Sequence, residues 1–200
     1  MKIFLIILFI IFNSYSADFV SKSLISKVEK KYNRFAKNRF LALNRLIKKL
    51  DKSSTKRKLE KVNDFFNNVR YKSDKAVYGT SDYWASPAEF LARDKGDCED
   101  YVIAKYFALK KLGIPTSKMF LTYVRVAGSS EAHMVLSYFA TPNSEPLILD
   151  SLRRIIFPAS KRTDLTPVYN FNPNVLNKGK RTSAHKKWDV LLKKIKRNKI

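Results

Sequence analysis

The stretch Asp94-Lys95-Gly96-Asp97-Cys98-Glu99-Asp100-Tyr101 decides how the rest of the chain is interpreted. Largely apolar residues follow it as far as Leu112, after which Gly-Ile-Pro ends the helical pattern. Because aspartate favours the N-cap, Asp97 predicts that Cys98 lies in the first turn of a mostly buried helix. Unpaired N–H groups and the helix dipole at that position stabilise a thiolate, so Cys98 is a candidate nucleophile.

Upstream of this stretch, the sequence predicts further helices. Apolar residues recur at three- and four-residue steps over residues 22–50 and again over residues 56–70, with lysines and arginines between them. Residues 71–85 have the composition of a loop. Ser86-Pro87-Ala88-Glu89 predicts a helix start, because serine caps, proline suits the first position and glutamate completes a capping box.

Downstream, the hydrophobic period changes from helical to extended. Residues 119–126, 132–139 and 146–150 are rich in branched and aromatic residues and are separated by turn signals, so we expect three antiparallel strands. Residues 158–177 have a loop-like composition, and residues 185–200 form a basic segment with helical character. The fold class expected is α+β, with the N-terminal helices and the nucleophile helix packed on a small antiparallel sheet.

A thiol nucleophile needs a base, and the base needs an acceptor that orients it. The chain has two histidines, and His185 lies in the basic C-terminal segment, so His133, at the start of the second strand, is the candidate base. Asp150 ends the neighbouring strand, and adjacent antiparallel strands bring such side chains within reach of each other. Taken one at a time, these residues are more often a core cysteine, a structural histidine and a turn aspartate than catalytic groups.

Several segments together resemble one protein family, the bacterial transglutaminase-like cysteine peptidases. The resemblance extends over about residues 60–175 and rests on residues 84–91, 96–101, 112–114, 132–136, 147–152 and 161–169. It implies a papain- or transglutaminase-like core in which Cys98 is the nucleophile, His133 the general base and Asp150 the residue that orients the imidazole. The basic helix at 22–50 and the residues after 178 lie outside what the resemblance explains.

The acidic residues around Cys98 raise an electrostatic problem, because negative charge next to a thiol disfavours the thiolate. A bound cation would relieve this, and the resemblance implies dependence on calcium, with Asp97, Glu99 and Asp100 as the matching ligands. Spacing alone does not predict calcium, since the sequence contains no twelve-residue calcium-binding loop. The alternative is that these acids cap the helix and offset its positive end.

The first sixteen residues predict a secretory signal peptide. A positive start precedes ten apolar residues, Ile3 to Phe12, and small residues follow at Ser14 and Ser16. Ten residues are too few to span a bilayer as a helix. We therefore expect a signal peptide at 1–16, a peptidase domain at 17–177 and a basic tail at 178–200. Since the chain has one cysteine, an intramolecular disulfide is excluded.

The net charge of +23 is concentrated in the flanks of the chain. Residues 22–75 contain 18 basic and 5 acidic residues, and residues 178–200 contain 10 basic and 1 acidic. Such charge attracts nucleic acid, anionic lipid or acidic partners, or else reflects lysine-rich solvated helix faces. For an exported protein we expect no nucleic-acid partner, whereas peripheral membrane contact stays open.

The resemblance also implies partners. It implies a periplasmic endopeptidase that cleaves a large surface adhesin near its N-terminus, and an inner-membrane receptor for cyclic di-GMP that sequesters the enzyme. Two other functions remain open. The same triad serves a transglutaminase-type acyl transferase, and the charge would suit a non-catalytic basic binding protein.

Overall fold

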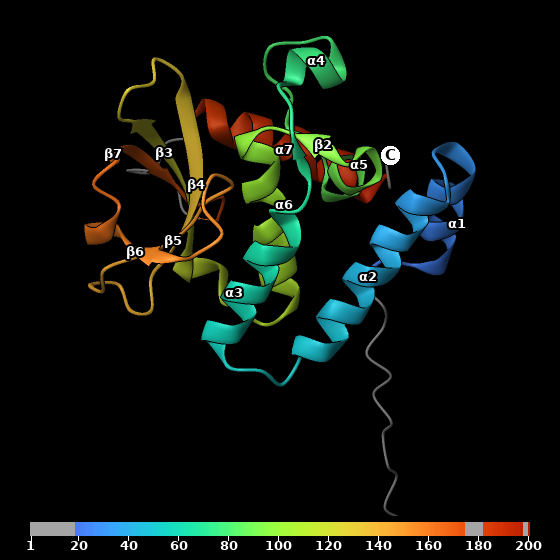
Figure 1. Cartoon of the computed structure of the whole chain (residues 1–200), viewed down its shortest axis with the longest axis horizontal. Helices are drawn as coiled ribbons and strands as arrows, with labels where there is room; N and C mark the ends of the chain where they lie inside the picture. Colours follow the sequence, from blue (N-terminus) through green and yellow to red (C-terminus); the bar gives the residue numbers. More distant parts are fainter. Residues whose placement is uncertain (1–18, 175–181, 198–199) are drawn as a thin grey trace, which may run out of the picture.

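The computed structural model describes residues 19–174, 182–197 and 200, and it arranges them as a helical layer beside an antiparallel sheet (Figure 1). The predicted signal peptide, residues 1–16, lies outside the described residues, as do residues 175–181 of the segment between sheet and C-terminal helix. Among the residues described, no helix combines the length and apolar character needed to cross a membrane. The mixed helical and antiparallel architecture confirms the predicted α+β fold class.

The helices occupy both ends of the chain and its centre. They are α1 (Lys22–Lys31), α2 (Arg34–Leu50), α3 (Thr55–Phe66), α4 (Asp74–Tyr78), α5 (Pro87–Arg93), α6 (Cys98–Lys111) and α7 (Ser183–Lys196), with 3-10 turns at Thr116–Lys118 and Ala159–Lys161. The single helical pattern expected over 22–50 is interrupted between α1 and α2. Asn33 begins a new helix there, because its side chain accepts a hydrogen bond from the N–H of Ala36 at 2.9 Å.

The main sheet has five strands in the order β6-β5-β4-β3-β7. They are β3 (Met119–Val126), β4 (Ala132–Tyr138), β5 (Leu147–Leu149), β6 (Phe157–Pro158) and β7 (Leu165–Phe171), and every neighbouring pair is antiparallel. Two short parallel strands, β1 (Arg70–Tyr71) and β2 (Lys95–Gly96), pair beside the helices. The three strands expected from the sequence therefore correspond to β3, β4 and β5.

Strand β7 lies in a segment for which the sequence predicted a loop. It pairs with β3 at the edge of the sheet, and its register shifts between Tyr123 and Val124. Pro167 lacks an N–H group, and a proline within a segment argues against a strand in the sequence. Proline is nevertheless tolerated in an edge strand beside a break in the register. The contact with β3 decides the conformation of this segment.

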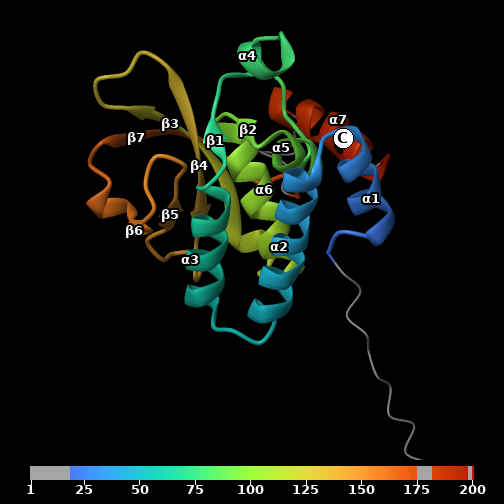
Figure 2. The same ribbon diagram turned by 45° about the vertical axis from the view of Figure 1, so that its right-hand side comes forward.

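Helix α6 is the centre of the molecule. It packs against β4 on one side and against α3 and α5 on the other, and these four elements lie close together in both views (Figures 1 and 2). Its buried residues occur on every side of the helix, including Tyr101, Val102, Ile103 and Ala104. A helix enclosed in this way holds its first turn in a fixed position relative to the sheet.

The C-terminal helix α7 packs on the core, although the sequence placed residues 178–200 in a tail. Trp188 is 6% exposed and stacks on Phe107, with ring centroids 5.4 Å apart. Its ring also contacts the edges of Trp84 and Tyr106. The charged residues of α7 obscure this apolar face in the sequence.

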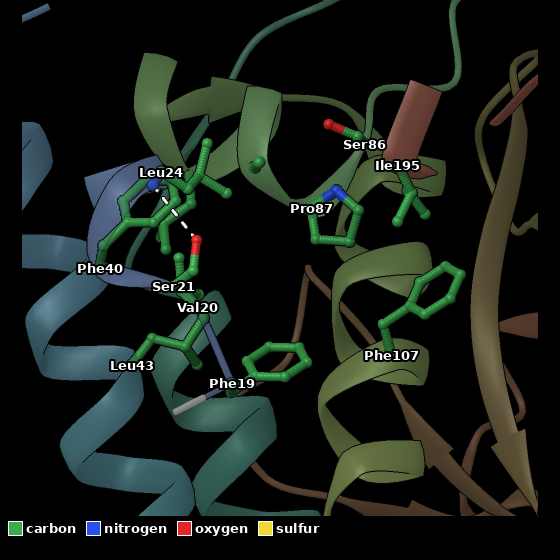
Figure 3. Close-up of a pocket in the computed structure, with 12 residues that line it drawn as sticks. Phe19, Val20, Ser21, Leu24, Phe40, Leu43, Ser86, Pro87, Phe107 and Ile195 are labelled. Carbon is green, nitrogen blue, oxygen red and sulfur yellow. Dashed lines mark hydrogen bonds between the residues drawn. The ribbon is translucent and has the colours of Figure 1, made fainter. Parts of the chain in front are cut away.

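An apolar cavity of about 360 Å³ lies between the N-terminal helices and α5, α6 and α7 (Figure 3). Phe19, Leu24, Phe40, Phe107 and Ile195 contribute to its wall, and Ser21 and Ser86 are the polar residues among those that line it. Because the lining residues in the described structure carry no titratable group, this cavity lacks the means for acid–base or nucleophilic chemistry.

Replacing Trp188 with alanine tests whether α7 is part of the core. We expect Trp188→Ala to lower the free energy of unfolding by about 3–5 kcal/mol, because it leaves a large cavity among aromatic rings. Val190→Ala is the control, since Val190 is 54% exposed on the same helix and surface changes cost within about 0.5 kcal/mol. Equal effects of the two changes in urea denaturation would contradict the packing of α7.

Candidate active site

The structure places Cys98 at the first position of α6, against strand β4. Its side chain is buried, and the N–H of Met134 donates a hydrogen bond to its sulfur. Asp97 occupies the N-cap as expected, but within the described chain its side chain makes no capping hydrogen bond. Its Oδ2 instead accepts from the N–H of Asp74 at 3.1 Å. The thiol therefore lies beside the residue that directly follows His133.

His133 and Asp150 meet in the buried part of the sheet. His133 lies in β4 and Asp150 directly follows β5, and these strands are antiparallel neighbours. The Nε2 of His133 is 2.8 Å from Oδ1 of Asp150. That contact leaves Nδ1 as the ring nitrogen for exchange of a proton with a thiol. The structure thus joins the predicted base to the predicted orienting residue, and it packs the helix that carries the predicted nucleophile against the same strand.

Arg162 holds the other side of Asp150, and sequence analysis did not identify it. Its Nη2 donates to Oδ2 of Asp150 at 2.8 Å, while its Nε donates to Asp164 at 2.8 Å. Burial would raise the pKa of Asp150, but the hydrogen bonds from His133, Leu152 and Arg162 outweigh it and hold the pKa below its usual range. Arg162 belongs to the segment 161–169 that carried part of the family resemblance, which was the available signal.

A cluster of carboxylates surrounds the start of α6. One oxygen from each of Asp74, Asp97 and Asp100 lies within 4.8 Å of the others, and Glu99 forms an overlapping group with Asp74 and Asp82. The structure thus groups Asp97 and Asp100 directly and places the third predicted ligand, Glu99, beside them. Asp74 and Asp82 were missed, since the sequence assigns them to a loop whose path it does not predict.

The geometry of the carboxylate cluster suits a divalent cation. Asp74 Oδ1, Asp97 Oδ1 and Asp100 Oδ2 are buried and have no hydrogen-bond partner among the described residues. Burial is the main cause that raises the pKa of Asp97 to about 7, and repulsion from Glu99 is the next largest. Burial also raises the pKa of Asp100. Buried oxygens without partners are costly, and hard cations such as calcium bind carboxylate oxygens, so these residues fit such an ion.

The surroundings of the thiol disfavour its ionisation. The Cys98 thiol donates a hydrogen bond to Oε2 of Glu99 at 3.0 Å. Burial raises the pKa of Cys98, and the charge and hydrogen bond of Glu99 raise it further. The electrostatic problem expected from the sequence is therefore present in the folded chain, and Glu99 is its main charged source.

A cavity of about 790 Å³ opens beside His133, between the β3–β4 hairpin and the start of α7. Ala132, which precedes His133, lines it together with Tyr123, Tyr169 and Lys187. The rings of Tyr123 and Tyr169 stack with centroids 5.2 Å apart. An extended segment of another chain has room to lie in this cavity, next to the residue that precedes His133.

A cysteine at a helix start, set against a strand that carries a histidine paired to an aspartate, defines the class of papain- and transglutaminase-like thiol hydrolases. The chain belongs to the family of bacterial transglutaminase-like cysteine proteinases, whose model matches residues 41–170. It is therefore a cysteine peptidase that acts on a protein substrate. Both the predicted family and the predicted enzyme class are confirmed.

Solved structures of Legionella pneumophila LapG are similar over nearly the whole fold. One is 43% identical, with a TM-score of 0.76, and the match covers 89% of this chain and 99% of LapG. An EGTA-treated form is 42% identical, with a TM-score of 0.75 and coverage of 89% and 99%. A calcium-bound form is 44% identical, with a TM-score of 0.74 and coverage of 88% and 99%. Among curated proteins, none matches the chain.

Gly96 tests how closely the first turn of α6 is seated. A Cβ at Gly96 would lie 2.6 Å from Phe90 and closer still to Oδ2 of Asp100. We expect Gly96→Ala to lower the free energy of unfolding by about 1–3 kcal/mol and to slow alkylation of Cys98, because α6 must shift. Gly113 lies at the far end of α6 with a φ of +83°, where alanine is strained. We therefore expect Gly113→Ala to lower the free energy of unfolding and to leave the alkylation rate of Cys98 unchanged. Unchanged alkylation in Gly96→Ala would contradict the tight seating.

Proposed function

We propose that the chain is an exported periplasmic endopeptidase that cleaves its protein substrate with Cys98, His133 and Asp150. The observation that carries the proposal is the 2.8 Å contact between His133 and Asp150. The residue that follows His133 in β4, Met134, donates its N–H to the sulfur of Cys98. The three side chains come from α6, β4 and the end of β5. His133 and Asp150 are buried polar groups that pair with each other, which supports a role beyond packing.

The proposed mechanism assigns a separate role to each ring nitrogen of His133. His133 accepts the thiol proton at Nδ1, while Asp150 holds the Nε2–H and stabilises the imidazolium. The sulfur attacks the carbonyl carbon, and the N–H of Cys98, at the start of α6 where helix N–H groups lack intrahelical partners, stabilises the oxyanion. His133 then protonates the amine, which leaves as a new N-terminus, and a thioester remains on Cys98. Water, deprotonated by His133, hydrolyses the thioester and releases the new carboxylate.

We propose calcium as the cation of the carboxylate cluster, held by Asp74, Asp97, Glu99 and Asp100. Support comes from the buried oxygens without partners in the described structure and from the existence of calcium-bound and EGTA-treated forms of the similar LapG. When bound, the ion supplies positive charge that offsets the carboxylates beside the thiol. The chain's own part is to direct these carboxylates toward one point at the start of α6.

For the substrate, we propose the N-terminal region of a large surface adhesin, whose cleavage releases the adhesin from the cell and so affects biofilm attachment. We also propose that an inner-membrane receptor for cyclic di-GMP sequesters the enzyme. Both rest on the family resemblance. The basic faces of α1, α2 and α7 are suited to contact an acidic adhesin, an acidic receptor or the membrane surface.

Replacement of Cys98 tests the proposed reaction. The mature chain is incubated with adhesin N-terminal fragments, and cleavage is followed by mass spectrometry. We expect Cys98→Ala to abolish cleavage, and His133→Ala and Asp150→Asn to lower kcat by factors on the order of 10³–10⁴. Incorporation of a primary amine in place of water would indicate the acyl transferase instead. Cleavage by Cys98→Ala would exclude the thiol mechanism.

Removal of calcium tests the proposed metal site. We expect a chelator to abolish cleavage and added calcium to restore it. Calcium at a hundred times its Kd should also raise the free energy of unfolding by about 2.7 kcal/mol, a readout that needs no substrate. Asp74→Asn should weaken this stabilisation, whereas Asp64→Asn, on the exposed side of α3, should not. Full activity in excess chelator would rule out the calcium requirement.

A further inference from the structure

Residues 82–85, between α4 and α5, hold two carboxylates of the proposed calcium site in place. The N–H of Tyr83 donates to Oδ2 of Asp74, and the N–H of Ala85 donates to Oδ1 of Asp100 at 2.8 Å. The other oxygen of each carboxylate, Oδ1 of Asp74 and Oδ2 of Asp100, is buried and has no hydrogen-bond partner among the described residues. Each N–H group therefore fixes one oxygen of its carboxylate and leaves the second oxygen available to a cation.

The C-terminal helix α7 contacts the same segment through Lys194 and Trp188. Lys194 donates to the carbonyl of Trp84 at 2.8 Å, and its Nζ lies 3.4 Å from the centre of the Tyr83 ring. The ring of Trp188 meets that of Trp84 edge-on, with centroids 6.4 Å apart. Helix α7 thus contacts both the backbone and the side chains of the segment that holds the carboxylates.

A single peptide group joins Lys194 to Asp100. The carbonyl that accepts from Lys194 and the N–H that donates to Asp100 are the two ends of the peptide bond between Trp84 and Ala85. This peptide bond is trans and planar, so its carbonyl and its N–H point in opposite directions. The ammonium and the carboxylate therefore lie on opposite sides of one rigid group, and rotation of that group would break its contact with Asp100.

We propose that Lys194 is a positioning residue of the calcium site, because it holds the peptide group that orients the carboxylate of Asp100. Trp188 supports this role by packing against Trp84. Residues that hold a metal ligand in place from behind contribute to metal affinity although they do not touch the ion. The helix α7 is thereby coupled to the start of α6. The inference rests on the proposed calcium site.

The sign of the effect on calcium binding separates positioning from simple repulsion. An ammonium close to the carboxylates repels a divalent cation. If Lys194 acted through its charge alone, its removal would therefore strengthen calcium binding. If Lys194 positions Asp100, its removal frees the peptide group and weakens calcium binding.

Calcium titration of Lys194→Met by isothermal calorimetry, without substrate and after treatment with a chelator, is the test. Methionine has a similar length and cannot donate to the carbonyl of Trp84. We expect the Kd for calcium to rise about tenfold or more, the loss usual for residues that support a metal ligand. Because the Kd is measured on folded protein, a general loss of stability does not produce this result.

Lys193→Met is the matched control. It removes the same charge from an exposed position next to Lys194 on α7, and it should leave the Kd for calcium unchanged. An unchanged Kd in a folded Lys194→Met would assign Lys194 to packing, and a lower Kd would assign it to repulsion. Either result would overturn the proposal.

Hydrogen exchange in the unmodified chain gives a second test, which decides the proposal if Lys194→Met fails to fold. Because coupling between two sites is reciprocal, calcium should slow exchange of the amides of α7. The amides of α1, the helix at the other end of the chain, which packs on α2, should be slowed less. Equal slowing in the two terminal helices would contradict the coupling.

Failure of the calcium site and failure of this inference give different results. A parent chain that does not bind calcium refutes the proposed calcium site and this inference with it. A parent chain that binds calcium, together with a Lys194→Met variant that binds it as tightly, refutes this inference alone.

Discussion

The position of the first turn of α6 against strand β4 is the constraint on which the site depends. That turn carries Cys98, and the N–H of Met134 in β4 meets its sulfur. Behind it, Asp100 is fully buried, and its Oδ1 accepts from the N–H of Ala85 at 2.8 Å. A side chain at position 96 would displace Asp100 and Phe90, and Gly96 has none. Because α6 is enclosed by the sheet and by α3 and α5, a small displacement of this turn would alter the thiol and the carboxylates together.

Asp150 connects the reactive side chains to the rest of the fold. Its Oδ1 accepts from His133 and from the N–H of Leu152, and its Oδ2 accepts from Arg162. Its own carbonyl accepts from Asn67 at the end of α3, at 2.8 Å. Helix α3 thus fixes the loop after β5, and this loop fixes the imidazole. Such supporting contacts maintain the geometry that acid–base chemistry requires.

The basic flanks of the chain have structural contacts in addition to their charge. In α7, Lys194 donates to the carbonyl of Trp84 at 2.8 Å, and Lys187 pairs with Asp82. In α2, Arg39 donates to the carbonyls of Leu91 and Ala92 at the end of α5, each at 2.8 Å. Part of the positive charge therefore ties the terminal helices to the segments around the site.

The sequence by itself determined the elements whose signals are local. The capping box at Ser86 and Glu89, the helix that starts at Cys98 and the strands that hold His133 and precede Asp150 all follow from short patterns of polarity and turn residues. The order and types of these residues also indicated the family. Tertiary structure alone decided that Pro167 lies in an edge strand, that α7 covers Trp84, that Asp74 joins the carboxylates at the start of α6, and that Arg162 binds Asp150. These features depend on contacts between residues far apart in the chain, and local patterns carry no information about such contacts because burial and charge pairing are properties of the packed molecule.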